Sequence, residues 1–176
     1  RSLMKQNKTK AITSALMHRS LSKGHLFFPN IFYKNLECDL LEINKASGFT
    51  TEYEVKVSKA DYKKDKFKTL KEYSNQDHIT IVNEVPKSQV LKKGQRVNYF
   101  YYVVPEGMVE VDEIPYYAGL IYAGLNKSGL SNSIHSVTFK LAKKAPKLSK
   151  NKIAPEDRAY CFEKMYYRNI KNIING

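Results

Sequence analysis

The chain has 176 residues and a mass of 20.3 kDa, enough for one domain that buries about 70% of its unfolded surface without disulfide or metal staples. Its 30 Lys and Arg residues outnumber 17 Asp and Glu residues, and the net charge of +13 favours a polyanionic partner such as nucleic acid. Two cysteines, Cys38 and Cys161, exclude a disulfide scaffold and a four-cysteine zinc site. With no apolar run near the roughly 20 residues of a membrane span and no signal-peptide pattern, we expect a cytoplasmic protein with no membrane contact.

The first elements predicted along the chain are a helix and two strands. Apolar residues recur at helical spacing within residues 9–22, which predicts a helix. Residues 37–43 (ECDLLEI) predict a short strand, and residues 50–57 (TTEYEVKV) alternate apolar and charged side chains, which is typical of a strand. That alternation puts three charged side chains on one face: Glu52, Glu54 and Lys56.

The remaining elements complete a mixed fold. Ser58 is a predicted N-cap for a helix over residues 58–73, and Pro155 is expected near the start of a C-terminal helix. Four further strands are predicted, at residues 78–82, 97–105, 118–124 and 137–142. We therefore expect the α/β class, with a mixed central sheet flanked by helices. The predicted domain covers residues 1–148, and residues 149–176 form a linker and a helical appendage.

The charges are unevenly distributed along the chain. Residues 1–36 and 140–152 are rich in lysine and contain no acid, and residues 56–71 are also rich in lysine. Residues 37–54, by contrast, hold five carboxylates against one lysine. A metal-dependent nuclease needs carboxylates that bind a cation, placed between segments that attract phosphate. The charge distribution of this chain matches that arrangement.

Pairing of the two strands at 37–43 and 50–57 would bring Asp39 beside Glu54. Two neighbouring carboxylates bind a hard cation such as Mg²⁺ through oxygen. Lys56, on the same face as Glu54, would orient or deprotonate a water molecule, or neutralise charge that builds on a phosphate. Two alternatives stay open: a surface ion-pair ladder on an exposed hairpin, and Glu52 as the ligand in place of Glu54.

Asp39 followed by Glu54-Val55-Lys56 resembles the motif of the PD-(D/E)XK nuclease superfamily, in which an acid on one strand precedes an E-x-K strand. The resemblance extends to the MmcB-like DNA-repair branch, in which the motif continues as E-x-K-S/V-S-x-A-D-F and then D-x-K-x-x-x-Y. Here EVKVSKADY, residues 54–62, is followed by Asp65 and Lys66 in exchanged order and by Tyr73. The likeness covers residues 9–148.

The chain departs from that branch in three places. Residues 74–96 are interpreted as an insertion, either a hairpin or a loop over the substrate. Glu37 and Cys38 occupy positions where basic or small residues are expected, and the predicted N-terminal helix has no acid for a second metal.

The resemblance implies a restriction-endonuclease-like core and a metal-dependent DNA endonuclease, a phosphodiester hydrolase acting in DNA repair or recombination. By the same resemblance, Asp39, Glu54 and the carbonyl of Val55 hold Mg²⁺ or Mn²⁺, and Lys56 is the catalytic lysine. Asp39, Glu54 and Lys56 are therefore the expected catalytic residues.

Four lysines are predicted to contact the nucleic-acid backbone: Lys59, Lys63, Lys143 and Lys144. The first two follow the E-x-K strand, and the last two belong to the basic segment 140–152. The alternative interpretation of that segment is a solvated face that contacts no nucleic acid. Two other functions remain open: a non-catalytic nucleic-acid-binding module on the same fold, and a basic scaffold that binds an acidic partner.

Overall fold

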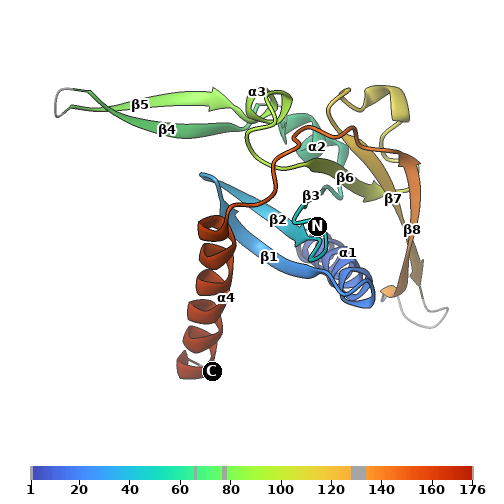
Figure 1. Ribbon diagram of the computed structural model, residues 1–176. Helices are drawn as coiled ribbons and strands as arrows, with labels where there is room; N and C mark the ends of the chain where they lie inside the picture. The colour runs from blue at the N-terminus through green and yellow to red at the C-terminus, as the bar shows by residue number, and fades with distance from the viewer. Residues whose placement is uncertain (1, 66, 77–78, 128–133, 176) are drawn as a thin grey trace.

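The computed structural model describes residues 2–65, 67–76, 79–127 and 134–175 and has an α/β architecture, as predicted (Figure 1). Its elements, in chain order, are α1 (Ser2–Ser22), β1 (Leu26–Tyr33), β2 (Leu36–Ile43), β3 (Thr50–Val55), α2 (Lys59–Asp65), β4 (Thr69–Gln76), β5 (Ile79–Pro86), α3 (Lys87–Lys92), β6 (Tyr99–Pro105), a 3-10 turn (Val111–Glu113), β7 (Gly119–Lys127), β8 (Ile134–Lys143) and α4 (Pro155–Asn175). The six-stranded sheet has the order β1-β2-β3-β6-β7-β8. Strands β3, β6 and β7 are parallel neighbours, and the other pairs are antiparallel.

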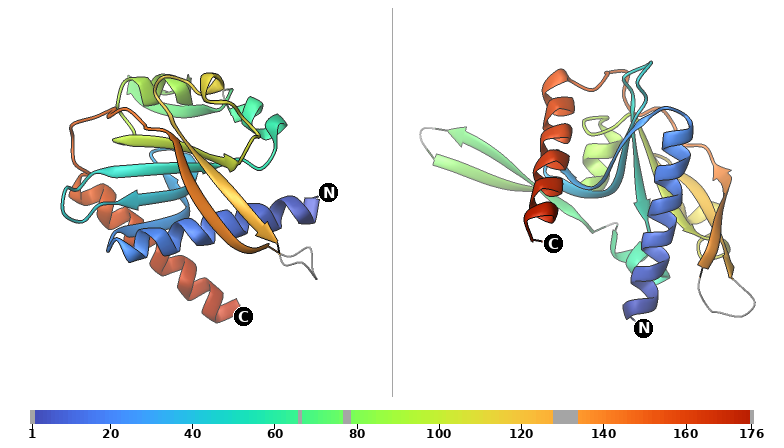
Figure 2. Two further views of the ribbon diagram at one scale, coloured as in Figure 1. Left: turned by 90° about the vertical axis from the view of Figure 1, so that its right-hand side faces the viewer. Right: turned by 90° about the horizontal axis from the view of Figure 1, so that it is seen from below.

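Helices cover both faces of this sheet. Figure 2 shows α1 and α4 on opposite sides of β1 and β2. Helices α3 and α4 share a face of the sheet, because Leu91 and Cys161 belong to the same apolar cluster. Ile12 and Leu16 of α1 are buried against Leu40, Val55 and Val103, which makes one apolar cluster. A larger cluster contains residues from β1, β2, β6 and β7 together with Cys161 of α4. Within the described residues, no helix is long and apolar enough to cross a lipid bilayer.

The first strand was not predicted from the sequence. Its segment contains Pro29, which cannot donate a ladder hydrogen bond, and Asn30, which has a positive φ of 47°. Proline is tolerated on edge strands, and β1 lies at the edge of the sheet, paired only with β2. The predicted first helix, by contrast, was too short, since α1 begins at Ser2.

The helix predicted over residues 58–73 is wrong in its second half. Helix α2 ends at Asp65, and β4 begins at Thr69. The helical spacing was misleading because Phe67 is exposed whereas Leu70 is buried, so the two do not share an apolar helix face. Pairing with β5 takes up the backbone hydrogen bonds of β4, so tertiary contacts override the local pattern.

The predicted insertion contributes to a projecting hairpin. Strands β4 and β5 pair antiparallel from Thr69↔Pro86 to Gln76↔Ile79 and extend away from the main sheet (Figure 1). Helix α3 follows the hairpin directly. The strand predicted at residues 78–82 corresponds to the start of β5, and its first residue lies outside the described part of the chain. The other predicted strands agree with the structure to within a few residues.

The segment before α4 is fastened to the sheet by Asn98. Its side-chain oxygen accepts a hydrogen bond from the Thr50 amide at 2.7 Å, and its side-chain nitrogen donates to the carbonyls of Ser149 and Asn151 at 2.9 and 2.8 Å. The Asn98 carbonyl also accepts from the Leu148 amide at 2.8 Å. The predicted linker is therefore held against the domain over this stretch.

Replacing Asn98 by alanine should destabilise the protein, because it leaves the buried Thr50 amide without its acceptor. An unsatisfied buried group costs about 1–3 kcal/mol, and the reduced stability should appear in urea unfolding. Hydrogen exchange should also accelerate in residues 148–153. The matched control is Asn151→Ala, which removes an exposed side chain and keeps the carbonyl that Asn98 uses. Equal destabilisation by both variants would contradict this role for Asn98.

Candidate active site

The candidate site lies where β2 and β3 separate. The two strands pair from Ile43↔Thr50 to Leu40↔Tyr53, and beyond that point β3 continues beside β6 as far as Val55↔Val103. At the separation, the Asp39 carboxylate accepts a hydrogen bond from the Val55 amide at 2.7 Å. Asp39 is thus positioned by the backbone of the E-x-K segment itself.

Glu54 is the carboxylate with the most cationic neighbours at this site. Its side chain is buried, with 1% of the residue exposed. Oε1 accepts from Lys56 and, at 2.5 Å, from Lys68, while Oε2 accepts from Lys87 at 2.9 Å. Burial alone would raise the pKa of Glu54, but the ammonium groups of Lys87, Lys56 and Lys68 together outweigh it and hold the pKa well below its ordinary value. Glu54 is therefore an anion at neutral pH.

Lys56 connects Glu54 with a further buried acid, Asp65. The Lys56 ammonium lies 3.1 Å from Asp65 Oδ1, and the Lys68 ammonium lies 3.0 Å from the same oxygen. Burial would lower the pKa of Lys56, but Glu54 and Asp65 raise it above its ordinary value. Lys56 is consequently a cation, which suits charge stabilisation better than removal of a proton from water.

Tyr102 completes the set of partners around Asp65. Its hydroxyl donates to Asp65 Oδ2 at 2.8 Å from the neighbouring strand β6. Burial, and then the charge of Asp65, raise the pKa of this phenol, so it remains a neutral donor. Asp65 is thus held by a hydroxyl on one oxygen and by ammonium groups on the other.

Glu52 belongs to a separate, fully enclosed ion pair. Arg96 donates through Nε to Glu52 Oε2 at 2.5 Å, and the Lys87 ammonium lies 3.1 Å from Oε1. The guanidinium also donates to the carbonyls of Tyr33, Lys34 and Leu36. This locked arrangement does not support the alternative in which Glu52 is the metal ligand. The alternative of an exposed ion-pair ladder is wrong, because the charged face of β3 is buried.

Asp39 differs from the other carboxylates because it is only half-buried and, among the described residues, forms no ion pair within 4.0 Å. Burial and the nearby charge of Glu54 raise the pKa of Asp39 to about 6, against the Val55 amide, Lys56 and Lys68, which lower it. A cation placed between Asp39 and Glu54 would relieve the repulsion between the two carboxylates.

The donor chemistry at Asp39 and Glu54 suits a hard cation, since both offer oxygen from adjacent strands. Four carboxylates (Asp39, Glu52, Glu54 and Asp65) are balanced by four cations (Lys56, Lys68, Lys87 and Arg96). In the described part of the chain, no group of three or more His, Cys, Asp or Glu residues is placed to hold a metal ion. A cation fits if Lys68 withdraws from Glu54, and the 37% exposure of the Lys68 side chain gives it a path into solvent.

A surface pocket of about 670 Å³ borders the site. Its lining includes Asn30 of β1 and, after the E-x-K segment, Val57 and Asp61. Asn30 lies between Pro29 and Ile31, which pair with Leu40 and Cys38, so Asn30 is directly across from Asp39. The rest of the lining comes mainly from α1, and the pocket approaches the E-x-K segment through Val57 and Asp39 through Asn30.

The four lysines predicted to bind nucleic acid fall in two places. Lys59 and Lys63 are on α2, immediately after the site, where Lys59 pairs with Glu113 at 3.1 Å and Lys63 is exposed. Lys143 and Lys144 lie at the end of β8, towards the other edge of the sheet. The Lys143 ammonium donates to two backbone carbonyls at 2.9 Å, whereas Lys144 is exposed. Lys63 and Lys144 are thus the more available of the four.

Sequence reasoning assigned no role to five residues of the cluster: Asp65, Lys68, Lys87, Arg96 and Tyr102. Lys87 and Arg96 come from the predicted insertion and contact carboxylates 33 and 44 residues earlier in the chain. Asp65 was part of the MmcB-like motif, and this was the one available signal. Two other residues of that motif, Lys66 and the side chain of Tyr73, lie outside the described residues.

Comparisons with known proteins support the fold. A solved structure, the SPO1766 protein of unknown function from Silicibacter pomeroyi, is similar with a TM-score of 0.52 at 15% sequence identity. The alignment covers 93% of this chain and 84% of that one. No family model matches the sequence, and no curated protein matches it.

Replacing Arg96 by methionine should be strongly destabilising, because Glu52 would be left as a partly uncompensated buried charge. Breaking one partner of a buried pair costs about 3–5 kcal/mol, which urea unfolding can measure. Lys68→Met is the matched control, since its ammonium is partly exposed and should contribute no more than about 1 kcal/mol. Adding Glu52→Gln to Arg96→Met should recover part of the stability. No recovery in the double variant would show that the pair is not the cause.

Proposed function

We propose that this protein is a metal-dependent nuclease that hydrolyses phosphodiester bonds in DNA. The observation that supports this best is the arrangement of three residues: Asp39 is fixed on the Val55 amide, beside Glu54, with the Lys56 ammonium on Glu54. A pocket lined by Val57, the residue after Lys56, lies beside this segment, and the net charge of +13 favours approach of a polyanion.

In this proposal, Asp39 and Glu54 hold Mg²⁺ or Mn²⁺, which supplies Lewis-acid polarisation of the phosphoryl oxygen. The Val55 amide keeps the Asp39 carboxylate oriented towards the gap between the strands. Lys56 is held as a cation between Glu54 and Asp65 and stabilises negative charge on the reacting phosphate. Lys68, whose side chain is 37% exposed, would have to leave Glu54 Oε1 for this carboxylate to hold the metal. The carbonyl of Val55 remains the proposed third protein ligand.

The resemblance to the PD-(D/E)XK superfamily and its MmcB-like branch extends the proposal to a restriction-endonuclease-like core and a role in DNA repair or recombination. Cys38 and Cys161 are free and buried, which suits a reducing compartment, and we place the protein in the cytoplasm.

A second candidate, a non-catalytic nucleic-acid-binding module, is favoured by one specific observation. Both oxygens of Glu54 are already occupied by ammonium groups, which can replace a metal ion as the source of positive charge. In that case the cluster stabilises the fold, and the exposed lysines alone make the functional surface.

The nuclease proposal predicts cleavage of supercoiled plasmid or single-stranded DNA with Mg²⁺ or Mn²⁺ and no cleavage with EDTA. Asp39→Asn and Lys56→Ala should lower the cleavage rate by about 10²–10³-fold, because each removes a charge that acts on the transition state. DNA affinity measured in EDTA should stay close to that of the wild type. Circular dichroism would verify that both variants are folded. Metal-independent cutting, or full activity in Lys56→Ala, would contradict the proposal.

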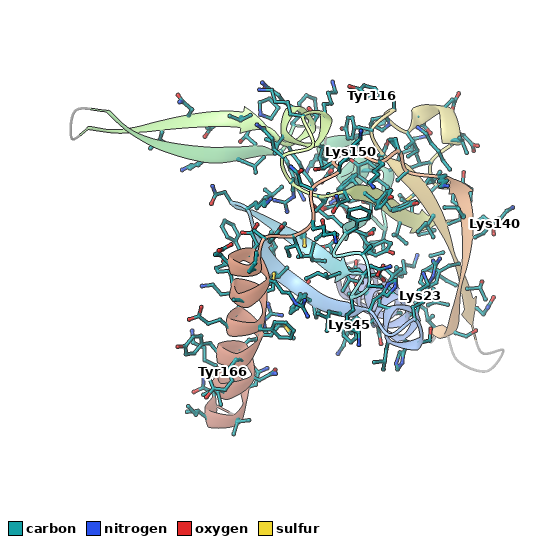
Figure 3. All side chains as sticks on the ribbon, in the orientation of Figure 1. Lys23, Lys45, Tyr116, Lys140, Lys150 and Tyr166 are labelled. Atoms are coloured by element: carbon teal, nitrogen blue, oxygen red, sulfur yellow. The ribbon has the colours of Figure 1, made fainter. Side chains whose placement is uncertain are left out.

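Nucleic-acid binding through the exposed lysines has its own test. Lys63→Glu and Lys144→Glu should each weaken DNA binding and lower the slope of log affinity against log salt by about one for each phosphate that no longer binds a lysine. The matched control is Lys23→Glu at the exposed end of the first helix; Figure 3 labels this lysine and shows others, such as Lys140 and Lys150, on different parts of the molecule. If all three variants have the same effect, binding is non-local and these positions make no particular interaction with DNA.

A further inference from the structure

A second concave surface lies between the edge strand β1 and the C-terminal helix α4. This groove has a volume of about 750 Å³. Its walls carry three aromatic and three basic side chains: Phe32, Tyr160, Tyr167, Lys164, Arg168 and Lys171. Phe32 and Tyr167 are 55% and 54% exposed, so their rings are open to a ligand. Among the described residues that line the groove there is no carboxylate.

The groove is held in place before any ligand binds. Arg168 donates to the carbonyls of Pro29 and Asn30, at 2.6 Å in each case, and so fixes α4 against β1. Earlier on the same helix, Phe162 contacts Phe28 edge-to-face with ring centroids 5.2 Å apart. Tyr160, Lys164, Tyr167 and Lys171 recur every three or four positions along α4, which places them on one face of the helix.

The groove meets the pocket beside the E-x-K segment at Asn30. Asn30 lines the groove and also lines the 670 Å³ pocket that borders the site. It lies directly across from Asp39 in the β1–β2 pairing. A flexible chain that fills the groove can therefore continue past Asn30 into the pocket beside the E-x-K segment.

We propose that this groove binds single-stranded nucleic acid, with DNA as the natural ligand, and leads the strand to the site. The proposal rests on the proposed function for the identity of the ligand. Exposed aromatic rings stack on bases whose faces are free, and cations between the rings bind the phosphates. In a duplex the base faces are already stacked, so the rings of Phe32 and Tyr167 would have no partner. An acidic peptide would match the charge and leave the aromatic rings unused.

In the groove, Lys164 places a cation next to an aromatic ring, as stacking of bases combined with binding of phosphates requires. Its ammonium lies 5.1 Å from the centroid of the Tyr160 ring. A phosphate that binds Lys164 would draw the ammonium off the ring and expose the ring face to a base. Lys171 lies seven residues further along the same face of α4, where it can bind a second phosphate.

Fluorescence anisotropy with a labelled oligothymidylate, in EDTA and on the full chain, tests the inference. Tyr167→Ala and Phe32→Ala should each weaken single-strand binding by about tenfold, as expected when one base is no longer stacked, and leave the affinity for a duplex of equal length unchanged. Lys164→Glu and Lys171→Glu should weaken binding and flatten its salt dependence. The matched control is Tyr116→Ala, which removes an exposed tyrosine that is not part of the groove lining (Figure 3).

The inference is overturned if the Tyr167 and Phe32 variants bind the oligothymidylate as well as the wild type. It is also overturned if polyglutamate displaces the oligothymidylate as effectively as unlabelled single strand does, since the groove would then recognise charge alone. Cleavage is measured separately, with Mg²⁺. Groove-dependent binding without any cleavage would uphold the groove and reject the nuclease, whereas cleavage and binding unchanged in the groove variants would reject the groove and retain the nuclease.

Discussion

The buried charged face of β3 is the constraint on which the rest of the structure depends. A carboxylate removed from water needs a cation and hydrogen-bond donors, or it is strongly destabilising. Glu52 obtains both of its cations, Lys87 and Arg96, from a segment far away in the chain, and Lys87 also pairs with Glu54. The segment that carries these two cations is therefore a required part of the folded domain, although in sequence it interrupts the resemblance to the MmcB-like branch.

The sequence was sufficient to predict the neighbourhood of Asp39 and Glu54, because β2 and β3 are consecutive and their pairing follows from a short connection. It was not sufficient to predict that the charged face is buried. Alternation divides a strand into two faces and does not tell which face the protein covers. The residues that cover this face are distant in sequence: Lys87 contacts Glu54 across 33 residues, and Arg96 contacts Glu52 across 44. No local sequence pattern encodes such contacts. The α/β class needed only the order of elements, whereas β1 and β4 were missed because proline, exposed phenylalanine and polar residues obscured their period.

The two candidate functions differ in what balances the charge of Glu54. In the binding module, ammonium groups do so permanently. In the proposed nuclease, Asp39 and Glu54 would hold a divalent cation that supplies part of this charge, and Lys68 would be free to bind the phosphates of the substrate. The same residues serve both cases, and the exposure of Lys68 makes the exchange sterically accessible. The raised pKa of Asp39, at about 6, is what a carboxylate shows when burial and a neighbouring anion oppose its ionisation.

The base of the β4–β5 hairpin carries two of the lysines that neutralise Glu54. At its base, the Lys87 amide donates to the Lys68 carbonyl at 2.8 Å, so the two lysines that flank the hairpin are joined through the backbone. Both side chains end on Glu54. A displacement of the base of the hairpin would therefore move two of the three cations of Glu54 together.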